Sequence, residues 1–63
     1  MTIYELIEIE NNRIFNTKLF QKEDRLENYL YSRFDDDQAK YLLSLGNISF
    51  DNIQVFLFEK EVS

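Results

Sequence analysis

The chain has 63 residues, with twelve acidic and seven basic side chains, and it lacks histidine, cysteine and proline. The formal charge of −5 argues against a general nucleic-acid binder, because such proteins cluster Lys and Arg to displace counterions from phosphate. It also disfavours attachment to anionic membranes. Without thiols or imidazoles, disulfides and the usual zinc sites are excluded. We expect one domain over residues 1–63.

The N-terminal stretch Met1–Glu5 lacks the basic leader of a secretory signal. No apolar run approaches the roughly 20 residues that span a bilayer. A cytoplasmic location is therefore expected. The abundance of Asn, Ile, Lys and Phe is typical of AT-rich coding sequences. Compact accessory proteins of phages and mobile elements have this general character, and by analogy we expect a protein of that kind.

Two strands are predicted at the start of the chain, over Thr2–Ile9 and Arg13–Phe20. Between them, Asn11-Asn12 suits a two-residue turn, because Asn tolerates positive φ. With that turn, the numbers of facing residues sum to 23, so that an opposite-charge pair forms next to the turn and several apolar pairs follow. The alternation of apolar and polar residues does not indicate which face of the hairpin is buried.

This register makes specific pairings that a structure can test. Glu10 should face Arg13, and Glu5 should face Lys18. Both pairs join opposite charges across the two strands, which favours the register.

From Lys22 to Phe34 the apolar residues change to helical spacing. They form one stripe, made of Leu26, Tyr29, Leu30 and Phe34. Glu23 and Asp24 lie in the first turn, where the helix dipole favours anions. The sequence therefore predicts an amphipathic helix here.

A second helix should begin at Asp35, which forms an Asp variant of the capping box with Gln38. The only glycine, Gly46, stands where a left-handed C-terminal cap is expected. The expected inward face consists of Ala39, Leu42 and Leu43.

The last predicted strand, Ile53–Glu59, is apolar on both faces, because Phe56 and Phe58 alternate with Val55 and Leu57. We predict an α+β fold of the order ββααβ, with a three-stranded, largely antiparallel sheet and both helices on one face. The sequence leaves open which hairpin strand pairs with the last one. Two short helices cover only one side of such a sheet, so the second side indicates a dimer or a bound partner.

Acidic residues gather around the two predicted helices. They are Glu23, Asp24, Glu27, Asp35, Asp36 and Asp37. A ridge of these carboxylates would imitate nucleic-acid phosphates and bind a basic surface, while the plainer interpretation is a solvated face with helix-dipole stabilisation. A calcium loop starting at Asp35 is not indicated, since its sixth position is Lys40 and its twelfth is Gly46.

The aromatic residues divide into two groups. Phe15, Phe20, Tyr29 and Phe34 are expected in the core. Four others lie off the apolar stripes or on the second face of the last strand, and we assign them to a protein-binding surface because aromatics are enriched in binding hot spots: Tyr31, Tyr41, Phe56 and Phe58.

No catalytic, cofactor-binding or metal-binding residues are predicted, and an enzyme is not expected. The leading hypothesis is a non-catalytic protein-binding module, a small acidic regulator or inhibitor of a larger, nucleic-acid-handling protein with a basic surface. In its sharpest form the hypothesis predicts mimicry of nucleic-acid charge, without direct binding of nucleic acid or membrane. The alternative is a structural or assembly protein, either a homodimer or a small subunit that extends a neighbour's sheet.

Overall fold

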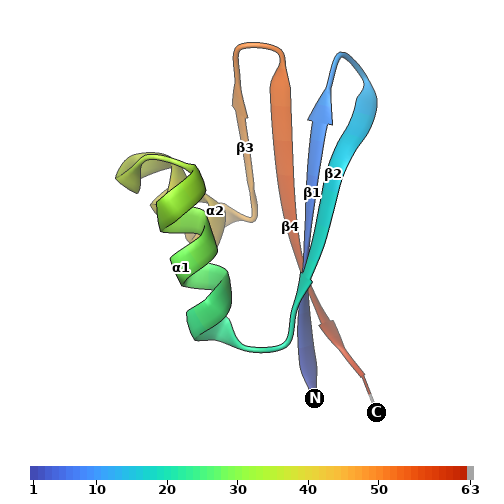
Figure 1. The fold of residues 1–63 in the computed structure, drawn as a ribbon, viewed down its shortest axis with the longest axis vertical. Coiled ribbons are helices and arrows are strands. Elements are labelled where there is room, and N and C mark those ends of the chain that lie inside the picture. Colours follow the sequence, from blue (N-terminus) through green and yellow to red (C-terminus); the bar gives the residue numbers. More distant parts are fainter. Residues whose placement is uncertain (63) are drawn as a thin grey trace.

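The computed structural model describes residues 1–62 (Figure 1), so the predicted domain of residues 1–63 extends one residue beyond the described part. Its elements, in chain order, are β1 (Thr2–Glu10), β2 (Arg13–Phe20), α1 (Glu23–Arg33), α2 (Asp36–Leu45), β3 (Asn47–Phe50) and β4 (Ile53–Glu61). The α+β class and the two consecutive helices are confirmed.

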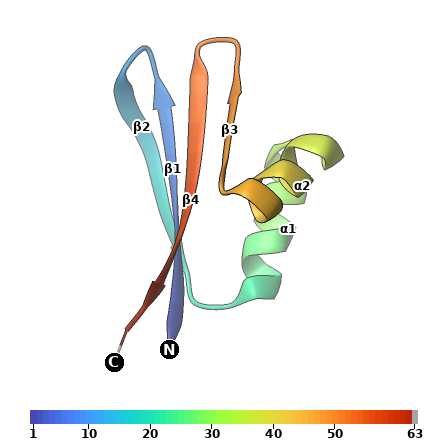
Figure 2. The ribbon, with the colours of Figure 1, turned by 180° about the vertical axis from the view of Figure 1, so that it is seen from behind.

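The strands form one antiparallel sheet in the order β2-β1-β4-β3. The first and last strands of the chain are therefore its central pair, and the two ends lie side by side (Figures 1 and 2). The amide of Val62 donates to the carbonyl of Met1 at 2.8 Å. The partner of the last strand, which the sequence left open, is thus β1.

The prediction of three strands is wrong, because the sheet has a fourth strand, β3. No strand was predicted for the segment 47–52, between the second helix and the last strand. Instead, Asn47–Phe50 pairs with β4 through a turn at Asp51 and Asn52, and Asp51 has a φ of 53°. Alternation explains the strand, since Ile48 and Phe50 both pack against the core.

The predicted hairpin register is correct only beside the turn. Asn11 and Asn12 have φ of 52° and 65°, and Glu10 pairs with Arg13 as expected. Between Glu8 and Ile9 the register shifts by one residue, at a β-bulge. Beyond it, the prediction that Glu5 faces Lys18 is wrong.

The bulge brings two polar side chains together. It places Asn16, rather than Phe15, opposite Glu8. The amide of Asn16 then donates to the buried carboxylate of Glu8 at 3.0 Å, which an aromatic ring would not do. Phe15 was expected in the core, but its side chain is 46% exposed.

Both helices lie within a residue of their predicted bounds, and capping contacts fix those of α2. The side chain of Asp35 accepts from the amide of Gln38 at 2.8 Å, and the side chain of Gln38 accepts from the amide of Asp35 at 3.2 Å. Gly46 ends α2 in the left-handed conformation, at a φ of 83°. These contacts confirm the capping box and the glycine cap.

The core lies between the helices and one face of the sheet. Its fully buried apolar residues are Leu6, Leu26, Leu30, Ala39, Leu42 and Val55, and half-buried side chains that include Phe20, Tyr29 and Phe34 pack against them. The predicted stripe of α1 is confirmed. Leu43 was expected to face inward with Ala39 and Leu42, which are fully buried, but its own side chain remains 36% exposed.

Candidate protein-binding surface

Both helices lie on the same side of the sheet, and no other helix or strand of residues 1–62 covers its opposite side (Figures 1 and 2). Strand alternation sorts the side chains between the two sides. On β1, Leu6 and Glu8 are buried under the helices. The residues that alternate with them along β1 therefore point to the uncovered side of the sheet, which we call the outer face.

The outer face is mainly apolar and draws on three strands. Pairing places Ile7 opposite Phe56 and Glu5 opposite Phe58, so the β1 and β4 side chains are neighbours. The large apolar residues of the outer face are Ile3, Ile7, Ile9, Ile14, Leu19, Phe56 and Phe58. The second apolar face that the sequence predicts for the last strand is therefore part of a larger apolar surface that extends over the neighbouring strands.

Several of these side chains are open to solvent. Leu19 is 68% exposed, Ile14 61% and Phe58 45%. The rings of Phe56 and Phe58 stack with centroids 6.2 Å apart. Contiguous exposed apolar surface on a small protein marks an interaction site more often than isolated exposed residues do.

The outer face carries no net charge. By alternation, the only charged strand residues on it in the described chain are Glu5 and Lys60. Glu5 Oε1 lies 2.9 Å from Lys60 Nζ, which pairs the two charges across β1 and β4. The excess of negative charge therefore lies on other parts of the molecule.

The four aromatic residues predicted to bind a partner do not form one surface. Phe56 and Phe58 belong to the outer face, whereas Tyr31 and Tyr41 project from the helices, on the other side of the sheet. Tyr31 is 42% exposed and Tyr41 is 58% exposed. The position of the helical pair off the apolar stripes is as the sequence indicated.

Five of the six predicted acidic residues fall at opposite ends of α1. Glu23 and Asp24 begin this helix, whereas the Asp35–Asp37 run follows its end. Eleven residues at 1.5 Å each separate the two groups by about 16 Å. The carboxylate of Asp35 is already engaged in capping α2. The sixth, Glu27, lies within α1 between these two groups and is half-buried.

A different acidic group, which the sequence did not reveal, surrounds Tyr4. Partial burial of Tyr4 raises the pKa of its hydroxyl above 10.0, and nearby carboxylates raise it further. These carboxylates belong to Glu23, Glu59, Glu61 and Glu27, from α1 and β4. Sequence separation hid this cluster, since β4 reaches the start of α1 only in the folded chain.

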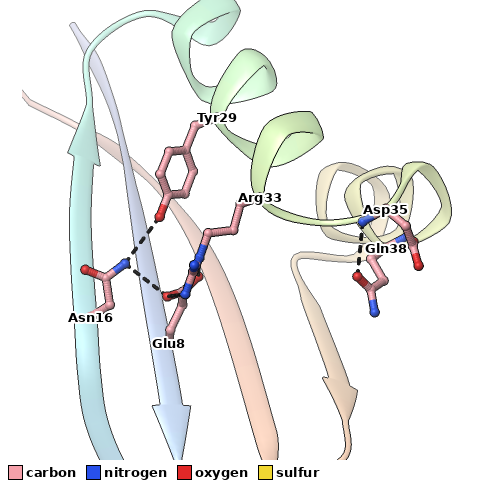
Figure 3. Close-up of polar contacts among 6 residues, drawn as sticks. All are labelled: Glu8, Asn16, Tyr29, Arg33, Asp35 and Gln38. Atoms are coloured by element: carbon pink, nitrogen blue, oxygen red, sulfur yellow. Dashed lines mark hydrogen bonds and ion pairs between the residues drawn. The ribbon is translucent and has the colours of Figure 1, made fainter.

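A buried ion pair joins α1 to the sheet (Figure 3). The carboxylate of Glu8, 1% exposed, accepts from Nε and Nη2 of Arg33, each at 3.0 Å. Asn16 donates to the same carboxylate and lies 3.3 Å from the Tyr29 hydroxyl. Both carboxylate oxygens are occupied, so this network holds the helix in place and has no free base for chemistry.

Sequence reasoning missed the Glu8–Arg33 pair, although one signal for it exists. Glu8 has the same parity as Leu6, and therefore lies on the buried side of β1. A carboxylate there needs a cation. Arg33, in the last turn of α1, is the basic residue of that helix end.

Within residues 1–62, no three acidic side chains gather in a way that would hold a metal ion. None of the helices in the described chain combines the length and the apolar character that crossing a bilayer requires. Comparisons with protein-family models, curated proteins and solved structures gave no match.

Proposed function

We propose that this chain is a non-catalytic protein-binding module and that it binds through the outer face of its sheet. The observation that carries the proposal is the uncovered apolar surface of β1, β2 and β4, with Leu19, Ile14 and Phe58 open to solvent. Absence of histidine and cysteine, together with full occupation of the buried Glu8 carboxylate, supports a binding role over a catalytic one.

A matched pair of variants tests this proposal. Phe58→Glu places a charge on the outer face, whereas Tyr41→Glu makes the same change of charge on α2, on the other side of the sheet. The tagged chain and both variants are immobilised, and an extract of the source cells, supplemented with untagged chain, is passed over them. We expect wild type and Tyr41→Glu to retain the same protein, and Phe58→Glu to lose it. Equal retention by Phe58→Glu would contradict the proposal.

A second candidate function follows from the acidic group around Tyr4. Tyr4 pairs with Glu59 in the sheet and lines the same surface hollow as Glu59 and Glu23, and the charges of Glu27 and Glu61 also reach its hydroxyl. Such a group of carboxylates suits a regulator or inhibitor that occupies the basic surface of a larger, nucleic-acid-handling protein, including by imitation of phosphate charge.

Salt dependence separates the two candidates. Association through the carboxylates weakens as salt rises, because exposed charges are screened over about 10 Å at 0.1 M. Association through the outer face does not weaken. The double variant Glu23→Gln/Glu59→Gln should reduce binding only in the first case. If it binds as wild type does, the regulator acting through this acidic group is excluded.

A further inference from the structure

We infer that the occupant of the outer face is a second copy of this chain, so that two sheets pack face to face about a two-fold axis. The inference rests on the proposed function, because it names the partner of that same surface. Two-fold dimers are the commonest oligomers, and sheets that pack face to face lie about 10 Å apart. The stacked rings of Phe56 and Phe58 would lie within the contact.

The size of the face is sufficient for a specific dimer. Of the three strands that form the outer face, β1 and β4 have nine residues each and β2 has eight. At about 3.3 Å per residue and 4.8 Å between strands, they cover roughly 400 Å² in projection. Side chains standing on that plane enlarge its accessible area. Two such faces would together bury on the order of 1,000 Å², which is the area that a specific interface needs.

The charges of the face favour a second copy over a charged partner. Glu5 and Lys60 neutralise each other at 2.9 Å, so a basic or an acidic partner would bury a charge with no free counterpart. A second copy presents the same neutral, apolar surface. Face-to-face packing also leaves Tyr31, Tyr41 and the helical acids of both copies on the outside of the dimer.

The small core of a single copy also favours association with a second copy. Only six apolar residues are fully buried in the described chain. Domains of this size commonly need a metal, disulfides or association to supplement such a core. Disulfides are impossible here because the chain has no cysteine.

The test is the molar mass in solution as a function of concentration, by light scattering and sedimentation. We expect the mass of the wild type to rise from 7.7 kDa towards twice that value between the low micromolar and the millimolar range. Phe58→Glu and Leu19→Lys change the outer face with opposite signs of charge, and both should stay monomeric with an unchanged circular dichroism spectrum.

Two control variants match them on the helical side. Tyr41→Glu adds the charge that Phe58→Glu adds, and Leu45→Lys replaces a leucine that is 66% exposed, against 68% for Leu19. Both controls should dimerise as the wild type does. A wild type that stays at 7.7 kDa at every concentration, or face variants that dimerise as the controls do, would overturn the inference.

A measurement on the wild type alone decides the matter if a face variant fails to fold. In a mixture of isotope-labelled and unlabelled chains, we expect nuclear Overhauser effects between Ile7 of one copy and Phe56 or Phe58 of the other. Effects confined to the edge strand β2 would show edge-to-edge pairing and overturn the face assignment. A monomeric wild type whose partner capture still depends on Phe58 would refute only the second copy and leave the proposed function standing.

Discussion

Replacing Arg33 by methionine will destabilise the chain more than any other single removal of a charge. The variant loses both hydrogen bonds from the guanidinium to Glu8 and leaves a carboxylate that is 1% exposed with Asn16 as its donor. Breaking a buried ion pair costs about 3–5 kcal/mol. Because the Arg33 side chain is 45% exposed, water reaches the vacated position, and we expect about 3 kcal/mol.

That loss is large against the stability of so short a chain. At about 0.05–0.15 kcal/mol per residue, a domain of this length has roughly 3–9 kcal/mol in total. Urea unfolding followed by circular dichroism, at one fixed protein concentration, measures the change. With a slope of about 1 kcal/mol per molar urea, the midpoint should fall by about 3 M.

Two further variants make the argument refutable. Arg25→Met removes an exposed guanidinium from the same helix and should cost less than about 0.5 kcal/mol. The double variant Glu8→Gln/Arg33→Met should recover about 1 kcal/mol or more relative to Arg33→Met, since it buries no charge. If Arg33→Met and Arg25→Met unfold at the same urea concentration, the buried pair does not hold α1 on the sheet.

Three other predictions concern caps and titration. Gly46→Ala should cost about 1–2 kcal/mol in urea unfolding, because the residue has a φ of 83° and an added Cβ would lie 3.3 Å from a backbone oxygen; an unchanged midpoint would contradict this. Asp35→Ala should cost about 1 kcal/mol and Asp36→Ala less, since only Asp35 caps α2; equal costs would refute the capping role. The raised pKa of Tyr4 means that its hydroxyl ionises first in the unfolded chain, so stability should fall as pH rises above 10. In thermal unfolding above pH 10, Tyr4→Phe should flatten that fall, and an equally steep fall in this variant would contradict the prediction.

What the sequence predicts correctly is governed by local chemistry. The cap at Asp35, the left-handed Gly46 and the positive φ of Asn11 and Asn12 each depend on residues within one turn of the chain. The apolar second face of β4 is also visible in the alternation of the sequence, and in the structure it forms part of the outer face.

What the sequence does not predict depends on contacts between distant segments. The bulge lies where Asn16 pairs with Glu8 and donates a hydrogen bond to its carboxylate. The buried carboxylate of Glu8 in turn needs the guanidinium of Arg33, 25 residues further along the chain. The strand β3 has four residues and polar neighbours, so its pattern resembles a loop until β4 lies beside it. The acidic group around Tyr4 forms in the same way, from segments that meet only in the folded chain.

The central position of β1 and β4 has a consequence for synthesis of the protein. Of the four described strands, β1 is synthesised first and β4 last, so β1 lacks one of its two neighbours until β4 has left the ribosome. During that interval the nascent hairpin of β1 and β2 exposes apolar side chains on both faces. A ribosome stalled before Ile53 would therefore hold an incomplete sheet, in which β1 lacks one of its two neighbouring strands.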